Sequence, residues 1–162
     1  MVIPYSEIPA EEYSGFVFHV ERIADLLDEI KPQHMAHWNE TEGYRHATPL
    51  NADYDTFMAH ERAGSYILFT ARKEGALVGN CAMYLSRSTH TQTMLATEDT
   101  LFFLPSVRGG FTALRFQKYI ERVLRALGVK EVRVSVKTIN NANVLLERMG
   151  FTKVSVQYSK II

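Results

Sequence analysis

An arginine followed by two glycines is the first feature of the sequence whose residue types could do chemistry. Arg108, Gly109 and Gly110 come just after an apolar run and just before a helix-like pattern. Glycine lets a backbone approach a ligand closely, and free N–H groups at a helix N-terminus attract anions. The forked guanidinium of Arg108 would add a cation that suits phosphate. The stretch therefore predicts an anion-binding turn, although Arg-Gly-Gly is also an ordinary turn from a strand to a helix.

Histidines are concentrated in the first part of the chain and raise the question of a metal site. His34 and His37 are three residues apart, but a metal would need further ligands of the right kind. No His-Glu-x-x-His pattern accompanies them, and the one cysteine, Cys81, lies inside an apolar segment. The sequence therefore predicts no metal site, and its lone thiol indicates a reducing, cytoplasmic setting.

Length and charge limit the classes of partner. The chain has 162 residues, 46% hydrophobic and 22% charged, which suits one globular domain over residues 1–162. Lysine plus arginine and aspartate plus glutamate are 18 each, so the formal net charge is zero. We expect no nucleic-acid partner, because such a surface needs a basic excess. We expect no membrane partner, since the sequence has neither a long apolar span nor a signal-peptide pattern.

The spacing of apolar residues predicts the elements that must position these groups. In chain order they are a helix within residues 17–36, a loop over 37–54, a short helix over 53–64, strands over 65–73, 76–88 and 91–104, a long helix over 116–127, a strand over 131–138, a short helix over 141–149 and a final strand over 151–162. Three antiparallel strands that lead into a strand–helix–strand crossover predict an α+β fold, with helices on the faces of a mixed sheet.

This order of elements, with the Arg-Gly-Gly turn in its middle and Gly150–Phe151 after the last helix, resembles the GNAT family of N-acyltransferases, most clearly over residues 66–158. The resemblance implies a central, mostly antiparallel sheet of about six to seven strands flanked by helices. In that family an Arg/Gln-x-x-Gly-x-Gly/Ala turn holds the pyrophosphate of acyl-coenzyme A. With Arg108 in first place, Ala113 fits the last place and Phe111 stands where glycine belongs. With Gly110 as the inner glycine, the turn is one residue short.

The resemblance implies acetyl-CoA as the co-substrate. It also implies contacts between the chain and this coenzyme at three places. The turn would hold the phosphates, the end of the preceding strand would pair with the pantetheine arm, and an asparagine before the last helix would contact the same arm. The residues concerned are Phe103, Leu104, Arg108, Gly109, Gly110, Phe111, Thr112, Ala113, Asn140 and Asn141. Either asparagine is also a preferred helix N-cap, and both roles can hold at once.

A general base is needed because an amine acceptor is mostly protonated at neutral pH. The family often uses a carboxylate on the strand before the phosphate turn, which here offers Glu98 and Asp99. Successive strand residues point to opposite faces, so only one can face the cleft. Glu98 is favoured as the base, because residues 98, 100 and 102 alternate along the strand and Glu98 would then share one face with Thr100 and Phe102.

The general acid of the family has no counterpart at the matching position. The family often has a tyrosine that protonates the departing thiolate, but Leu146 stands there and cannot donate a proton. Tyr84, Tyr158 or water could serve instead, although each tyrosine is also a packing residue.

The segment around the only tryptophan is the candidate acceptor side. His37, Trp38 and Glu40 form a His-Trp-x-Glu segment that resembles GNAT-like proteins of tailed bacteriophages. An aromatic wall and a carboxylate suit a cationic amine, although a structural aromatic anchor with solvated acids would give the same pattern.

The combined interpretation is a cytoplasmic N-acetyltransferase that moves acetyl from acetyl-CoA directly to a primary amine on a small molecule or a protein. The cytoplasm would be that of the host if a phage encodes the chain, and a homodimer is compatible with the family. Leu146 and the altered turn support an alternative, a non-catalytic binding protein on the same scaffold that engages a host protein.

Overall fold

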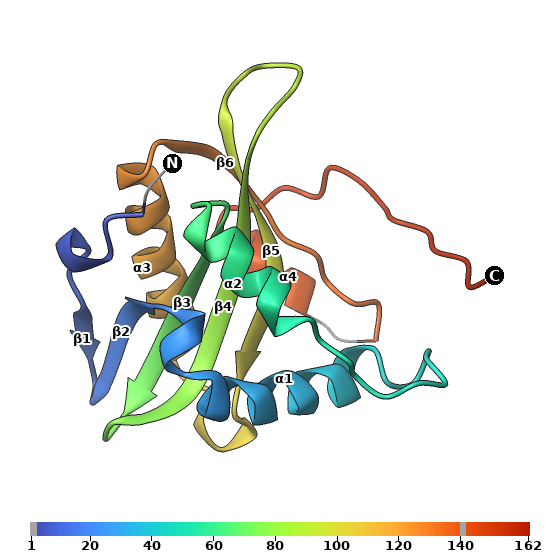
Figure 1. The fold of residues 1–162 in the computed structure, drawn as a ribbon, viewed down its shortest axis with the longest axis horizontal. Helices are drawn as coiled ribbons and strands as arrows, with labels where there is room; N and C mark the ends of the chain where they lie inside the picture. Colours follow the sequence, from blue (N-terminus) through green and yellow to red (C-terminus); the bar gives the residue numbers. More distant parts are fainter. Residues whose placement is uncertain (1–2, 140–141) are drawn as a thin grey trace.

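The computed structural model describes residues 3–139 and 142–162, and its centre is one mixed sheet. In the described residues the sheet has six strands, in spatial order β1 (Glu11–Tyr13), β2 (Phe16–Glu21), β3 (Tyr66–Lys73), β4 (Ala76–Arg87), β5 (Met94–Phe103) and β6 (Val129–Arg133). All neighbours pair antiparallel except β5 and β6, which are parallel. The predicted α+β fold with a mixed, mostly antiparallel sheet is confirmed (Figure 1).

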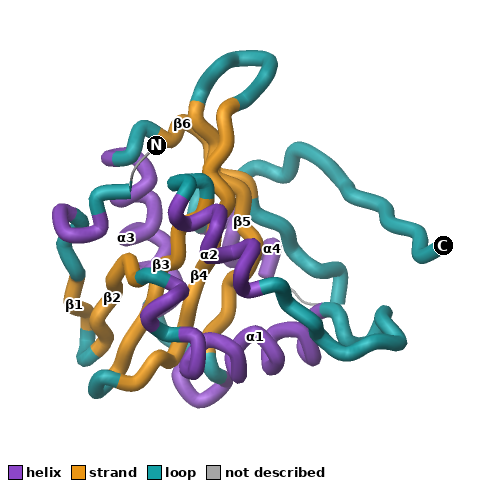
Figure 2. Tube along the Cα trace, in the orientation of Figure 1, coloured by secondary structure: helices purple, strands orange, loops and turns teal. Residues whose placement is uncertain are grey.

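Helices cover both faces of the sheet (Figure 2). They are α1 (Leu27–Thr41), α2 (Tyr54–Arg62), α3 (Thr112–Ala126) and α4 (Ala142–Arg148). The apolar face of α3 packs with alternate residues of β2 to β5 in one core. A second core, on the opposite face, joins α1 and α2 to Tyr66 and Leu68 of β3. The short helix predicted over 53–64 and the long helix before Gly128 are present, the latter beginning earlier, at Thr112. The short helix predicted over 141–149 is present over Ala142–Arg148, and residue 141 lies outside the described residues.

The helix predicted within residues 17–36 is wrong over its first part. Residues 16–21 form β2 instead, and α1 begins only at Leu27. Phe16, Phe18 and Val20 are all buried on one face, so a period of two competes with the helical spacing there and the pairing with β3 decides. The predicted loop over 37–54 is also too long, because α1 continues through Thr41.

The final strand predicted over 151–162 does not form in the structure. These residues have no regular structure and run out from the body (Figure 1). Val154 is 84% exposed and Tyr158 is 91% exposed. Alternation gives a segment strand propensity, but a strand needs the hydrogen bonds of a neighbour to be stable.

A network of buried amides fixes α1 against the sheet. The Nε2 of Gln33 donates to the Leu77 carbonyl oxygen at 2.8 Å, and the Nδ2 of Asn80 donates to the Gln33 Oε1 at 2.7 Å. Gln33 and Asn80 are both buried, and such bonds satisfy groups that are costly to bury alone. The helix that carries His37, Trp38 and Glu40 therefore has a defined place on β4.

Candidate functional site

The centre of the candidate site is the opening, defined as the place where β5 and the chain after β6 stop pairing. The parallel pairing of these strands ends at Thr97 and Arg133. β5 continues to Phe103, and no described strand pairs with it on that side. The predicted strand over 131–138 is correspondingly shorter, because residues 134–139 leave the sheet.

Phe103 offers its backbone to this opening, and Leu104 does not. The N–H of Leu104 donates to the Val78 carbonyl of β4 at 2.9 Å, and its carbonyl accepts from the Val107 N–H at 3.0 Å. Successive residues of a strand direct their backbone groups to opposite edges, so the N–H and carbonyl of Phe103 lie on the edge away from β4. Gly79 makes room for the Phe103 ring, because a Cβ at residue 79 would overlap that ring.

Glu98 lies where the opening begins. Its Oε2 accepts from the backbone N of Ser135 at 3.2 Å and from the Ser135 Oγ at 3.3 Å. The carboxylate thus bridges β5 and the chain that leaves β6. Burial raises the pKa of Glu98, and the hydrogen bonds from Ser135 oppose part of that rise.

A β-bulge gives Asp99 a different direction. Thr100 pairs with Ala82 and Glu98 pairs with Met83, so Asp99 is an extra residue without a partner on β4. Its Oδ2 accepts from the Tyr66 hydroxyl at 3.0 Å. Burial raises the pKa of Asp99, and the bond from Tyr66 opposes that rise.

The bulge also changes the face on which Glu98 lies. Thr100 pairs with Ala82, which belongs to the core under α1 and α2. Glu98 pairs with Met83, which belongs to the core under α3. The two-residue phase that grouped Glu98 with Thr100 does not exist in the structure, because the extra residue breaks it.

A cradle of free backbone N–H groups follows β5. After a 3-10 turn, η3 (Pro105–Val107), Gly109 and Gly110 have φ values of +138° and +57°, a region that favours glycine. The N–H groups of residues 109–114 donate to no acceptor in residues 3–139 and 142–162. The first such bond of α3 comes from Arg115, to the Phe111 carbonyl at 2.9 Å. Free N–H groups at the start of a long helix suit an anion.

Phe111, Thr112 and Ala113 form the start of α3 in this cradle. Phe111 is the N-cap residue, makes no side-chain cap bond and is 67% exposed. Thr112 is buried and Ala113 packs against the core under α3. The ring at residue 111, where the family pattern has glycine, therefore points outward from the core.

Arg108 connects the cradle to α1. Its Nε donates to the Phe103 carbonyl at 2.8 Å, and its Nη2 donates to both carboxylate oxygens of Glu40 at 2.8 and 2.9 Å. The guanidinium carbon lies 5.3 Å from the centroid of the Phe102 ring. The structure thus joins a residue predicted on the coenzyme side to one predicted on the acceptor side.

The other acceptor-side candidates lie on the same end of α1. The His37 ring is 5.8 Å from the Phe102 ring, and burial lowers the pKa of His37. Trp38 contacts His46, with 5.0 Å between ring centroids. Glu42 forms an ion pair with Lys137 in the segment after β6. The end of α1 is therefore linked to both sides of the opening.

Several candidates lie elsewhere or outside the described residues. Asn140 and Asn141 are not described by the structure. Tyr158 is on the exposed C-terminal segment, whereas the Tyr84 ring is 4.9 Å from the Tyr66 ring beside Asp99. Of the two tyrosines considered as general acids, only Tyr84 is thus placed near a candidate base.

Tyr66, Ser135 and Lys137 were not predicted from the sequence. Each lies in a strand-like segment of alternating residues, and neither its residue type nor its spacing sets it apart from its neighbours there. Only the bulge in β5 and the divergence after β6 bring these side chains to the site. The sequence carries no signal that could have identified them.

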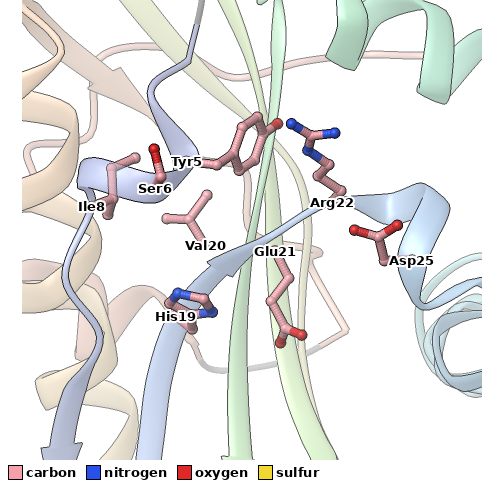
Figure 3. A pocket seen from close by; sticks show the side chains of 8 residues that line it. All are labelled: Tyr5, Ser6, Ile8, His19, Val20, Glu21, Arg22 and Asp25. Carbon is pink, nitrogen blue, oxygen red and sulfur yellow. The ribbon is translucent and has the colours of Figure 1, made fainter.

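A separate surface hollow of about 390 Å³ lies between the N-terminal turn and β2 (Figure 3). Its lining residues are Tyr5, Ser6, Ile8, His19, Val20, Glu21, Arg22 and Asp25. No candidate residue lines this hollow, and Glu21 is already bound to Arg72 at 2.9 Å. The hollow is not part of the candidate site.

A metal site requires several suitable side chains together, and a membrane-spanning helix requires length and apolar character. No cluster of three or more His, Cys, Asp or Glu side chains suited to a metal occurs in the described residues. Within the same residues, no helix has the length and apolar character to cross a membrane.

The mixed sheet with its flanking helices is a fold that solved structures of acetyltransferases share. An aminoglycoside acetyltransferase from an uncultured soil metagenomic sample, in complex with trehalose, aligns with a TM-score of 0.73 at 14% identity, covering 94% of this chain and 99% of that one. A ribosomal-protein-alanine N-acetyltransferase from Brucella melitensis aligns with a TM-score of 0.70 at 13% identity, covering 91% and 99%.

A glucosamine-6-phosphate N-acetyltransferase from Arabidopsis thaliana aligns with a TM-score of 0.63 at 14% identity, covering 90% of this chain and 97% of that one. At such identities the likeness establishes a shared fold. No protein-family model matches the sequence, and no curated protein matches it.

Proposed function

We propose that the chain is an acyl-CoA-dependent N-acyltransferase that passes acetyl from acetyl-CoA directly to a primary amine. The acceptor would be a protein lysine, a protein N-terminus or a small amine. One observation carries the proposal, the free N–H groups of residues 109–114 next to the unpaired edge of β5. An anion cradle beside a free strand edge suits a ligand that has both phosphates and an amide-bearing arm.

Different residues beside the opening suit different parts of such a ligand. The cradle from Gly109 to Ala113 would bind the phosphates, and the Phe103 N–H and carbonyl would pair with the arm. The Phe103 carbonyl would first have to give up its bond from the Arg108 Nε. Leu104 fits less well, because both its N–H and its carbonyl are bonded to the backbone of the chain. The bound coenzyme would supply the thioester that is attacked.

The transfer itself requires a proton acceptor. The amine nitrogen attacks the thioester carbonyl carbon, the C–S bond breaks with its electron pair on sulfur, and the amine proton passes to a carboxylate. Glu98 and Asp99 are the candidates, and burial raises the pKa of each. A carboxylate with a raised pKa accepts a proton more readily near neutral pH.

Replacement of Phe111 tests the cradle sharply. Aspartate is a preferred N-cap residue, so Phe111→Asp should keep or raise the melting temperature by capping α3. The same carboxylate would accept the N–H groups that phosphate needs and would repel it. We expect calorimetry to show micromolar acetyl-CoA binding in the wild type and at least about tenfold weaker binding in Phe111→Asp.

Phe111→Asn is the matched control, since it caps the helix without a charge and should lose less affinity. An absence of acetyl-CoA binding to the wild type at high micromolar ligand would overturn the proposal. If acetyl-CoA binds, the acceptor class can be sought with sisomicin, glucosamine-6-phosphate and a peptide with an N-terminal alanine. Sisomicin is the ligand in another structure of the soil metagenomic aminoglycoside acetyltransferase, and the other two amines correspond to the names of the other two similar proteins.

A non-catalytic binding function on the same scaffold is favoured by one observation. Leu146 of α4 has no proton to donate where the family often has a tyrosine. This alternative would be supported by two results together. The chain would bind acetyl-CoA without acetylating any of the three acceptors, and it would form a stable complex with a purified host protein.

A further inference from the structure

Arg108 is occupied, in this structure, by two groups of the chain itself. Its Nη2 is held by the Glu40 carboxylate at 2.8 and 2.9 Å, and its Nε is held by the Phe103 carbonyl at 2.8 Å. An anionic ligand in the adjacent cradle would compete with the first contact. An arm that pairs with β5 would compete with the second.

The contact with Glu40 is suited to exchange. The side chains of Arg108 and Glu40 are 43% and 42% exposed, so water can replace either partner. Exposed ion pairs are weak, and a phosphate oxygen can accept from the Arg108 Nη2 as the Glu40 carboxylate does. A phosphate group can therefore replace Glu40 at little cost.

The exchange does not require α1 to move. The Gln33–Asn80 bond holds the middle of the helix on β4, and the Glu42–Lys137 ion pair holds its C-terminal end to the segment after β6. Only the side chains at positions 40 and 108 need to change their partners. The helix would thus stay in place while its charges are redistributed.

Release of Arg108 would leave the Glu40 carboxylate without its cation, one helical turn from His37. Burial is the main cause that lowers the pKa of His37, and it disfavours a charged imidazolium that could replace the guanidinium. A free carboxylate beside an aromatic surface attracts an ammonium group, because charge and ring quadrupole both favour a cation.

We propose that Arg108 and Glu40 exchange partners during binding. The phosphate-bearing ligand takes Arg108, and Glu40 then becomes a binding carboxylate for a cationic group of the acceptor. Glu40 is thus an internal competitor of the first ligand and a specificity residue for the second. The inference rests on the proposed function for the identity of both ligands.

Calorimetry with coenzyme A tests the first half of the exchange. Glu40→Gln should bind coenzyme A about two- to fivefold more tightly than the wild type, as expected for loss of an exposed competing ion pair. Asp28→Asn removes the same charge at the other, exposed end of α1 and should leave the affinity unchanged. Arg108→Gln should weaken binding about tenfold.

The double variant separates competition from a general effect of charge. In Arg108→Gln the gain from Glu40→Gln should disappear, because the two residues act through one contact. Equal coenzyme A affinity in the wild type and Glu40→Gln would overturn the exchange and leave the proposed function intact. An equal gain in Asp28→Asn, or a gain that persists in the double variant, would also overturn it. No coenzyme A binding in any variant would instead overturn the proposed function.

Sisomicin, a polycationic amine, is the probe for the second half. By reciprocity, saturating coenzyme A should tighten sisomicin binding to the wild type, because it frees Glu40. Glu40→Gln should lose this increase while its coenzyme A affinity is retained or raised. Sisomicin affinity that is equal with and without coenzyme A would overturn the assignment of Glu40 to the acceptor.

Discussion

Glu98 and Asp99 are adjacent in the chain, yet the bulge in β5 gives them different surroundings. Glu98 bonds to Ser135 at the start of the opening, and Asp99 bonds to Tyr66 on the face that carries α1 and α2. Burial raises the pKa of both, and the charge of Asp99 adds to the rise at Glu98. The two carboxylates can therefore be distinguished by how the pH profile of turnover responds to each substitution.

If Glu98 is the general base, Glu98→Gln should lower kcat/KM about 10²- to 10⁴-fold and abolish the acidic limb of its pH profile. The wild-type rate should rise with pH through the raised pKa of Glu98, because only the ionised form accepts a proton. In Asp99→Asn the limb should persist and move to lower pH, since a neighbouring negative charge is removed. Profiles measured with an acceptor that is turned over would show this. An unchanged rate in both variants would exclude either carboxylate as the base.

At the scale of elements, the parts that local pattern dictates were predictable. The strands predicted over 65–73 and 76–88 form a hairpin that turns at Glu74 and Gly75, which both have positive φ. The α3 helix followed from its apolar stripe and the glycine after it. The parts that depend on distant segments were not predictable. The pairing of β2 with β3 overrides helical spacing, and the bulge at Asp99 is set by the register against β4.

The candidate site follows the same division. The cradle at Gly109 and Gly110 was predictable because positive φ and a helix start are local properties. The bond of Arg108 to Glu40 joins residues far apart in the sequence and depends on α1 crossing the end of β5. The coenzyme-side and acceptor-side candidates could thus be named separately, but their contact could not be predicted.

The packing of Gly79 under Phe103 gives a prediction for β4 and β5 together. Gly79→Ala would place a methyl group against the Phe103 ring, which should lower the free energy of unfolding by about 1–3 kcal/mol. It should also weaken acetyl-CoA binding, because the Phe103 backbone moves with its ring. Denaturant unfolding and calorimetry would measure the two effects.

Asp53→Ala provides the control for that variant. Asp53 caps α2 by accepting from the Thr56 N–H at 3.0 Å, so its loss should cost about 1 kcal/mol of stability. The helix α2 packs in the core that contains Tyr66 and Leu68, and Phe103 belongs to the other core, so acetyl-CoA affinity should not change. Equal losses of affinity in both variants would show that destabilisation alone weakens binding, contrary to the role given to Phe103.

For the molecule as a whole, several ionisable side chains are partly or fully buried, so the free energy of unfolding depends on pH. His34 is buried against Tyr54, with its Nδ1 3.1 Å from the Tyr54 hydroxyl, and burial lowers its pKa to about 4. Glu61, Glu98 and Asp99 have raised pKa values and respond in the opposite sense, because acid neutralises charges that are costly to bury. The net pH dependence of the wild type is thus a difference between opposing contributions.

The contribution of His34 can be isolated by comparing the wild type with His34→Gln. The unfolded chain binds a proton at this histidine near pH 6.5 and the folded chain only near pH 4, so acidification through this range favours unfolding. Between pH 7 and pH 4.5 the wild type should therefore lose about 2 kcal/mol more free energy of unfolding than His34→Gln. Urea unfolding at the two pH values measures this difference directly, whatever the absolute stability of the variant. Parallel pH dependence in the two proteins would mean that His34 is protonated as easily in the folded chain as in the unfolded one, and that its burial between α1 and α2 does not hold in solution.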